Sequence, residues 1–309
     1  MFIGIDIGGT SIKSGLLNSY GDIILKKEIP INNSDKYELI ESQIIKIIKI
    51  LLDESKKVGE NVKSIGIGIP GIADKDSDKV IYCTNLGWRN VPLGINIKKH
   101  FKIPVHIDND ATVAAIAENV KGVTKNYDNS IFITLGTGVG GGIIINNKVY
   151  SGSHNKGSEI GHIIVGKNFY DCNCGNNGCL ETFASATALI KYAKKLIDEG
   201  ESTILTKESL NAKVIFDAAK NEDILANMAV DRMVKYLSIG IGNLINLLDP
   251  DIIALGGGVS KAGDYLLEKI ENNVSKFLVF NEGKTTDITI AKLSNDAGII
   301  GAGMLQEYL

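Results

Sequence analysis

The feature that most constrains the fold of this chain is a short unit that occurs twice. Residues 2–18 read FIGIDIGGTSIKSGLLN, and residues 130–148 read SIFITLGTGVGGGIIINNK. In both, an apolar run typical of a buried strand leads into a turn of Gly and Thr, and a second apolar run follows. Two copies of one unit predict two domains of similar topology in an α/β chain.

The patterns between and after these units predict alternating strands and helices. Residues 35–57 place apolar side chains at steps of three and four, which is typical of a helix with one buried face, and Asn33 or Ser34 is the expected N-cap. Residues 21–29 predict a third strand, so that the sheet begins with antiparallel strands. The remaining expected elements are strands at 63–69 and 104–108, a helix at 111–122, a long helical stretch at 182–248, a strand entering a glycine turn within 251–260, and a final helix at 297–308.

The chain of 309 residues is long enough for one large or two ordinary domains. No low-complexity linker separates the two repeated units, and we place the domain boundary near Asp110. Residues 1–110 then form a small N-terminal α/β domain, which the C-terminal helix at 297–309 completes. Residues 111–296 form a large α/β domain.

The charge pattern argues against several classes of protein. The formal net charge is −3 and no basic stripe is visible, so nucleic-acid binding is not expected. No apolar run reaches the roughly 18 residues that cross a bilayer, and the apolar N-terminus carries Asp6 and no basic leader. We therefore expect a soluble cytoplasmic protein that binds small molecules, with neither nucleic acid nor membrane as a partner.

Two glycine-rich segments have the spacing of a nucleotide motif but the wrong context. Residues 66–71 and 136–141 match the glycines of the dinucleotide fingerprint, which requires a helix directly afterwards. The residues that follow them predict no helix. The segment near Lys284 resembles the end of a P-loop, but Leu278 stands where the first glycine is required. We therefore reject both the dinucleotide motif and the P-loop.

A strand–turn–strand phosphate loop remains. In a tight hairpin of Gly and Thr, backbone N–H groups point at an anion with no Cβ in the way, although a single such turn is more often only a hairpin. Asp6 precedes the first turn and Lys13 follows it, and an acid beside an anion site suggests a cation such as Mg2+ between them. A third turn opens a helix and leaves room for a base or a ribose. The candidate phosphate-binding residues of the three turns are Gly8, Gly9 and Thr10, then Gly136, Thr137 and Gly138, then Gly256, Gly257 and Gly258.

Polar residues lie between the strand at 104–108 and the helix that follows it. A carboxylate at Asp110 would stand at a strand end, where α/β proteins bind ligands, and could accept a proton from an attacking hydroxyl. Alternatively, Asp108 or Asp110 only caps the helix, and the residues alone do not decide. Asn85, in TNLGW, is likewise either a ligand contact or a turn residue before glycine.

Three of the four cysteines lie in one short loop, and a histidine precedes them. Thiolates and imidazole suit zinc, and four such ligands make a closed tetrahedral site with a structural role. A disulfide between the first two cysteines would be strained and would leave the third unpaired. Glycines at 175 and 178 let the loop turn tightly. The predicted zinc ligands are His162, Cys172, Cys174 and Cys179.

The motifs DIGGT, DNDA, LGTGVGGG, GSEIGH and CNCGNNGCLE resemble those of the ROK family of sugar kinases and repressors. The resemblance spans essentially the whole chain, and NLGWRNVPL and LETFASATAL are most similar to the bacterial glucokinase branch. It implies a two-domain actin-like ATPase (ribonuclease H-like) fold with a central cleft. It also implies ATP-dependent phosphorylation of a sugar, a structural zinc ion and a homodimer.

The resemblance further implies roles for individual residues. Asp110 matches the catalytic base of the family, and ATP with Mg2+ would occupy the glycine turns. We expect zinc to order the sugar-binding loop, and we expect the acceptor to be O6 of a hexose, with glucose as the substrate. The residues that match sugar-contacting positions of the family are Asn85, Asn109, Asp110, Glu159, His162 and Glu181.

There are three alternative functions. The first is a kinase for another sugar, such as N-acetylmannosamine, N-acetylglucosamine, fructose or allose, because small loop differences decide such specificity. The second is a protein of the same family that senses a sugar without catalysis. The third is a repressor, which carries a DNA-binding module ahead of the sugar domain. The first phosphate turn lies within ten residues of the start, so we expect no such module.

Overall fold

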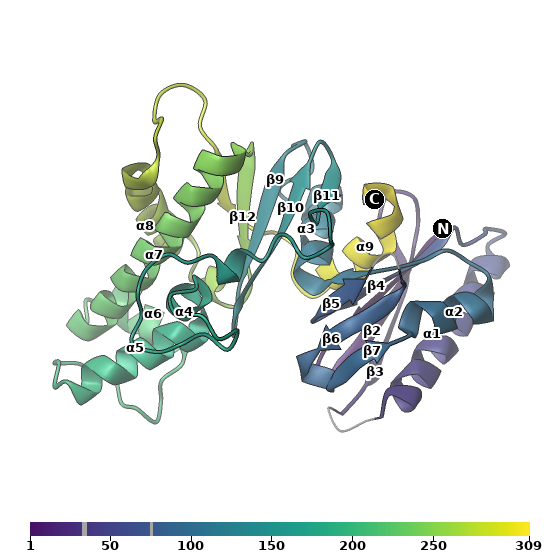
Figure 1. The fold of residues 1–309 in the computed structure, drawn as a ribbon, viewed down its shortest axis with the longest axis horizontal. Coiled ribbons are helices and arrows are strands. Elements are labelled where there is room, and N and C mark those ends of the chain that lie inside the picture. Colours follow the sequence, from purple (N-terminus) through teal and green to yellow (C-terminus); the bar gives the residue numbers. More distant parts are fainter. Residues whose placement is uncertain (33–35, 75–76) are drawn as a thin grey trace. The chain divides into compact units, whose positions relative to one another are not determined.

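The computed structural model describes residues 1–32, 36–74 and 77–309. These residues form two compact units (Figure 1). The first unit comprises Met1–Asn129, Gly142–Ser158 and Lys292–Leu309, and the second comprises Ser130–Gly141 and Glu159–Ala291. The domain boundary near Asp110 stays a prediction; in the structure this residue begins a helix inside the first unit.

A mixed five-stranded sheet organises the first unit. Its strands, in the spatial order β3-β2-β1-β4-β8, are β3 (Ile23–Pro30), β2 (Ser11–Leu17), β1 (Phe2–Ile7), β4 (Ser64–Ile69) and β8 (Val105–Asn109). β2 runs antiparallel to both β1 and β3, which confirms the predicted antiparallel start. β4 runs parallel to β1 and to β8. A small antiparallel sheet is added by β5 (Ile72–Asp74), β6 (Lys79–Cys83) and β7 (Trp88–Val91), with the 3-10 turn η1 (Thr84–Leu86) between the last two.

Four helices accompany these sheets. They are α1 (Tyr37–Lys57), α2 (Leu93–Phe101), α3 (Asp110–Lys121) and α9 (Ala297–Met304), the last continuing into the 3-10 turn η5 (Leu305–Tyr308). The expected helix start at Asp35 and the expected caps Asn33 and Ser34 lie outside the described residues. The predicted apolar stripe of α1 runs from Tyr37 to Leu51 and is confirmed: Tyr37 is half-buried against the core, and the other members are buried, namely Ile40, Ile44, Ile47, Ile48 and Leu51.

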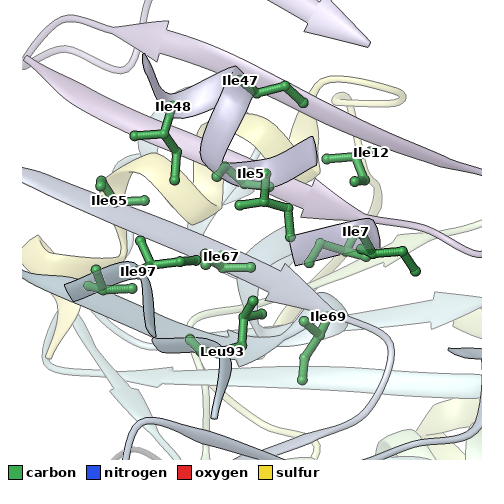
Figure 2. Packing of buried hydrophobic residues seen from close by; sticks show 14 of the residues in the cluster. Ile5, Ile7, Ile12, Ile47, Ile48, Ile65, Ile67, Ile69, Leu93 and Ile97 are labelled. Atoms are coloured by element: carbon green, nitrogen blue, oxygen red, sulfur yellow. The ribbon is translucent and has the colours of Figure 1, made fainter. Parts of the chain in front are cut away.

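Isoleucine occupies every second position of β1 and β4, with Phe2, Gly4 and Asp6 on the other face of β1 and mainly glycine on the other face of β4, so the two faces of the sheet have different neighbours. On one face, the isoleucines pack with α1 and α2 in a continuous apolar core. On the other face, a Cβ at Gly4 would lie 1.9 Å from the carbonyl oxygen of Ile299, and a Cβ at Gly66 would lie 1.7 Å from that of Ala302. Glycine therefore allows α9 to pack directly on the strands. Figure 2 shows the core residues Ile5, Ile7, Ile12, Ile47, Ile48, Ile65, Ile67, Ile69, Leu93 and Ile97.

The second copy of the sequence repeat, residues 130–148, begins another five-stranded sheet. Its spatial order is β11 (Lys148–Tyr150), β10 (Val139–Ile145), β9 (Ser130–Leu135), β12 (Ile252–Gly256) and β13 (Asp287–Ile290). β12 runs parallel to both β9 and β13. The glycine turn after β9 leads into strand β10 rather than a helix, as predicted, which is why the dinucleotide motif does not apply here.

The long helical stretch predicted at 182–248 is wrong as a single stretch, because the structure divides it into four helices. They are α4 (Glu181–Ala184), α5 (Ala186–Asp198), α6 (Ala212–Lys220) and α7 (Ile224–Leu248). Ser185, Asn211 and Asp223 each restart a helix by accepting a hydrogen bond from a backbone N–H of its first turn. Gly200, with a φ of +87°, leads the chain out of α5.

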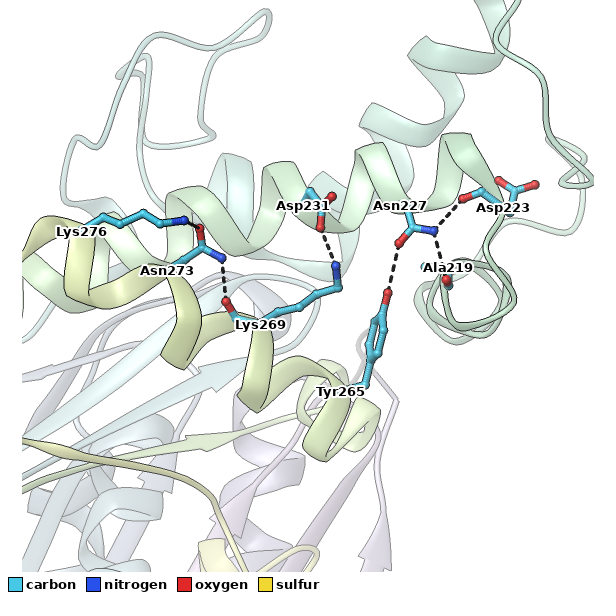
Figure 3. Close-up of polar contacts among 8 residues, drawn as sticks. All are labelled: Ala219, Asp223, Asn227, Asp231, Tyr265, Lys269, Asn273 and Lys276. Carbon is cyan, nitrogen blue, oxygen red and sulfur yellow. Dashed lines mark hydrogen bonds and ion pairs between the residues drawn. The ribbon is translucent and has the colours of Figure 1, made fainter.

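Helix α7 packs along α8 (Asp264–Val274) through polar contacts, which Figure 3 shows. The Tyr265 hydroxyl donates to Oδ1 of Asn227 at 3.2 Å, and Lys269 pairs with Asp231 at 2.7 Å. The 3-10 turns η2 (Ile160–His162), η3 (Val259–Ala262) and η4 (Ser275–Phe277) complete the described elements. Within the described residues, none of the helices combines the length and the apolar character that a membrane span requires.

Candidate functional site

The first phosphate turn joins β1 to β2 and has an acid and a base on its two strands. Asp6 and Lys13 are direct cross-strand partners, and the N–H of Gly8 donates to the carbonyl oxygen of Ser11 at 2.9 Å. A Cβ at Gly298 would come within 2.3 Å of the Asp6 carboxyl, so this group lies against the first turn of α9. Burial raises the pKa of Asp6, and the positive charge of Lys13 opposes the rise.

Asn109, rather than either neighbouring aspartate, caps helix α3. Its Oδ1 accepts a hydrogen bond from the N–H of Ala111 at 2.8 Å, and its Nδ2 donates to the carbonyl oxygen of Gly71 at 3.0 Å. The alternative in which Asp108 or Asp110 provides the cap is therefore wrong as a description of the main capping contact. Asp110, the first residue of the helix, makes only a local contact with the N–H of Ala111 at 2.9 Å.

The carboxyl group of Asp110 has an unusual protonation equilibrium. Its side chain reaches solvent, but the surrounding protein raises its pKa to about 6 by desolvation, and the negative charge of Asp6 adds to the rise. The two carboxylates are close because Asp6 is in register with Gly68 of β4, and Gly68 is in register with Asp108 of β8. Both therefore stand at the same edge of a largely parallel region, with oxygen ligands that suit a hard cation.

The second and third phosphate turns also share one sheet edge. Gly256 at the end of β12 pairs with Thr134 near the end of β9, so the turns at 136–138 and 256–258 leave adjacent parallel strands. In the second turn, the N–H of Gly136 donates to the carbonyl oxygen of Gly138 at 2.9 Å. The N-terminal end of α5 contacts this turn through the N–H of Ala186 and the hydroxyl of Thr187, which donate to the carbonyl oxygens of Gly136 and Thr137, both at 2.8 Å.

The third turn borders a small cavity. Gly257 has a φ of +86°, and a Cβ there would lie 2.5 Å from the carbonyl oxygen of Leu135. The turn leads into η3, and the α-helix expected directly after it begins only at Asp264. A cavity of 190 Å³ is lined by Gly258, Val259 and by Phe216 and Lys220 of α6.

The predicted zinc ligands converge on one point. The ligand atoms of His162, Cys172, Cys174 and Cys179 all lie within 4.8 Å of one another, and all four cysteines of the chain are free thiols. Sγ of Cys172 is 3.7 Å from Nδ1 of His162, and Sγ of Cys174 is 3.5 Å from Sγ of Cys179. Such separations match the edges of a tetrahedron around zinc, for which metal–sulfur distances are about 2.3 Å. The donor set therefore fits zinc.

The backbone of this loop explains how three thiols can meet. Gly175 and Gly178 have φ values of +93° and +95°, which side-chain-bearing residues rarely adopt. A Cβ at Gly178 would also lie 1.8 Å from the carbonyl oxygen of Gly166. The N–H of Asn176 donates to the sulfur of Cys174 and is the main cause that lowers the pKa of this thiol to about 7. The thiolate that a metal needs is thus already favoured at Cys174.

A clamp of side chains, which the sequence interpretation missed, holds the same loop. The N–H of Asn168 donates to Oδ1 of Asn177 at 2.8 Å, and Nδ2 of Asn177 donates to Asp171 at 2.8 Å. Arg232 of α7 donates to Oδ1 of Asn168 at 2.7 Å, and its guanidinium lies 4.3 Å from the ring centre of Tyr192. Asn177 stands within the cysteine motif and could have been suspected, whereas nothing in the sequence links Arg232 to the loop.

The residues expected to contact sugar fall in both units. Asn109 and Asp110 belong to the first unit, and Asn85 lies exposed in η1 of that unit. In the second unit, the exposed Glu159 directly precedes η2, and Glu181 begins α4. Nδ1 of His162 faces the thiols, so its Nε2 is the ring nitrogen left for another contact.

Comparison with known proteins places these features in a family. The ROK family model matches residues 2–308. A glucokinase from Halalkalibacterium halodurans is 39% identical over 98% of this chain and 94% of its own length, and a putative xylose repressor from Caldicellulosiruptor is 33% identical over 97% and 76%. A ROK family glucokinase from Streptomyces griseus, solved with glucose and AMPPNP, has a TM-score of 0.76 and 31% identity, covering 98% of each chain. The expected α/β fold of the actin-like ATPase type is confirmed by this likeness. The chain therefore belongs to the ROK family.

Proposed function

We propose that this protein is a glucokinase, an ATP-dependent kinase that transfers a phosphoryl group to O6 of glucose. The observation that carries the proposal is the position of the Asp110 carboxyl group, which directly follows β8 at the start of α3, where desolvation and the charge of Asp6 raise its pKa to about 6. A base that ionises near neutral pH is suited to accept a proton from a hydroxyl. The 39% identity to a glucokinase supports glucose as the acceptor.

Phosphoryl transfer depends mainly on positioning and on the stabilisation of charge. Asp110 accepts the proton from O6 as this oxygen attacks the γ-phosphorus, and Asn109 caps the helix that carries the base. Asp6 is the residue that would hold Mg2+, which supplies positive charge beside the phosphates. Lys13, across from Asp6, adds a second positive charge at this turn.

The second unit would bind the nucleotide. The N–H of Gly136 closes this turn on the carbonyl oxygen of Gly138, and the backbone amides of Thr137 and Gly138 would face the phosphates. The cavity beside Gly258 has an apolar wall that includes Phe216 and Val259, against which the base would pack. We also assign phosphate binding to the matching turn at Gly8, Gly9 and Thr10.

Sugar recognition would come from carboxylates and amides, which are good partners for hydroxyl groups. We assign this role to Asn85, Asn109, Asp110, Glu159, His162 and Glu181. A zinc ion held by His162 and the three cysteines would have no catalytic position open, because all four sites are protein ligands. We also expect a cytoplasmic homodimer, as the family resemblance implies.

One other function has a specific observation in its favour: the likeness to a putative xylose repressor favours a non-catalytic sugar sensor. A kinase for another sugar, such as fructose, allose, N-acetylglucosamine or N-acetylmannosamine, is tested beside it, because small loop differences decide such specificity. ADP release should be measured across a panel of glucose, mannose, fructose, allose, N-acetylglucosamine and N-acetylmannosamine, with zinc quantified in the same sample. Glucose should give the highest kcat/KM. Binding of sugar without any ADP release would instead identify a sensor.

A further inference from the structure

One side chain, Glu181, contacts both the second phosphate turn, residues 136–138, and the metal loop, which we define as residues 162–179. Its Oε2 accepts a hydrogen bond at 3.0 Å from the backbone N–H of Val139, the residue in which the turn ends and β10 begins. The same oxygen lies against Gly138, since a Cβ at that position would be 2.3 Å from it. The carboxylate therefore occupies the space beside the turn that a side chain at position 138 would fill.

The backbone of Glu181 is held from the opposite side by the metal loop. The residue follows Cys179 by two positions, and its Oε1 lies 3.8 Å from Sγ of Cys172. The carbonyl oxygen of the next residue, Thr182, accepts hydrogen bonds from Nδ2 of Asn168 at 2.7 Å and from the hydroxyl of Tyr170 at 2.9 Å. The loop thus fixes the backbone from which the carboxylate reaches the turn.

Both contacts border one cavity of 270 Å³. Its wall includes Thr137 and Gly138 of the turn, Cys172 and Asn173 of the loop, and Glu181 between them. A hydrogen bond from a main-chain N–H to an ionised carboxylate is about twice as strong as one between neutral groups. A displacement of the loop would therefore be transmitted to the turn through this bond.

We propose that Glu181 is a positioning residue for the second phosphate turn, and that it couples nucleotide binding to the state of the metal loop. The inference rests on the proposed function, which assigns the turn to ATP and the loop to the sugar. Coupling between two binding sites is reciprocal, so a sugar that orders the loop raises nucleotide affinity by the same factor as the nucleotide raises sugar affinity. A side chain that contacted only the sugar would leave nucleotide affinity unchanged when no sugar is present.

The test is the affinity for AMPPNP with Mg2+, measured by calorimetry without sugar. Glu181→Gln keeps an oxygen acceptor for Val139 and should bind AMPPNP within about twofold of wild type. Glu181→Met has the same length and no acceptor, and should bind about tenfold more weakly. Glu159→Gln alters another carboxylate assigned to the sugar and should change sugar affinity alone. Hydrogen exchange at the Val139 amide should accelerate in Glu181→Met and not in Glu159→Gln.

The outcomes separate this inference from the proposed function. Unchanged AMPPNP affinity and unchanged Val139 exchange in Glu181→Met, with zinc retained, would overturn the inference. A wild-type protein that binds no AMPPNP would overturn the proposed function, and exchange at Val139 would still decide whether Glu181 positions the turn. If Glu181→Met loses zinc, Glu181→Asp takes its place with the same expected results, because it keeps the charge but is too short to reach Val139.

Discussion

The two copies of the strand–turn–strand unit have the same order of strand, Gly/Thr turn and strand. They differ in which parts of the chain place charged side chains near the turn. The first turn has Asp6 and Lys13 on its own strands. The strands of the second turn, β9 and β10, contain no charged residue, and its carboxylate comes from Glu181, 42 positions from Val139 in sequence. A hairpin of Gly and Thr is therefore encoded locally in both places. The chemistry around it is local only in the first copy.

The largest expected effect is at the charged edge of the first copy. Asp110→Asn removes the base but keeps the size of the side chain, so kcat should fall by about 10²–10⁴-fold while sugar affinity stays within about threefold. Asp108→Asn is the matched control, since its amide oxygen can still accept from the N–H of Asn109. Steady-state kinetics and sugar calorimetry provide the measurements. Undiminished turnover in Asp110→Asn would remove this residue from the mechanism.

Loss of the metal should affect the second copy and spare the first. Cys174→Ala removes one of four ligands, so zinc should fall from about one ion per chain to nearly none, and the melting temperature should drop by several degrees. Sugar affinity should fall with it. Cys83→Ala, which alters a buried cysteine outside the loop, should retain zinc. Sugar affinity that survives zinc loss would mean that the Asn168 clamp alone orders the loop.

The raised pKa of Asp110, to which the charge of Asp6 contributes, predicts that activity depends on pH. Asp110 acts as a base only when ionised, and its pKa is raised to about 6. Activity should therefore be constant above pH 7 and fall by about tenfold per unit as pH decreases below 6. Asp6→Asn should shift this limb to lower pH, because it removes the repulsion that contributes to the raised pKa, although it will also lower the maximal rate. A limb unmoved by Asp6→Asn would show that desolvation alone sets the pKa.

The smallest expected effect compares two glycines of the second turn. A Cβ at Gly138 would displace the Glu181 carboxylate, whereas a Cβ at Gly136 would meet nothing within 4 Å. Gly138→Ala should raise the KM for ATP only a few-fold, because the Glu181 side chain that the new methyl group displaces is flexible. Gly136→Ala should leave the KM for ATP within about twofold. Equal effects of the two substitutions would show that the turn responds to any added methyl group rather than to Glu181.

Much of the fold was predictable because its signals are local. The apolar runs within residues 2–7 and 63–69 identify strands, and the stripe of α1 identifies a helix with one buried face. The single stretch predicted at 182–248 failed, because periodicity alone does not reveal where Ser185, Asn211 and Asp223 restart a helix. Residue types that cap helices were visible at these positions in the sequence and would have indicated where the stretch divides into separate helices.

Parts of the candidate site were likewise visible, and others were not. The thiols and the histidine lie within one short segment, so spacing and ligand type were enough to predict their convergence. By contrast, Asp108, Asn109 and Asp110 are all residue types that cap helices. Only the backbone geometry shows that Asn109 is the residue that caps α3. The raised pKa of Asp110 comes first from desolvation by the surrounding protein and then from the negative charge of Asp6, which is more than a hundred residues away in sequence.

By itself, the sequence determined the strands of the first sheet, helix α1, the two Gly/Thr hairpins and the metal-binding loop, because each depends on neighbours within about twenty residues. Tertiary structure decided which distant groups interact: Asp6 with Asp110, Glu181 with the turn at Gly138, and Arg232 with Asn168. The physical reason is that hydrogen bonds and desolvation act over a few ångströms in space. Only packing, such as the close approach of α9 that glycine permits, brings distant segments within that range.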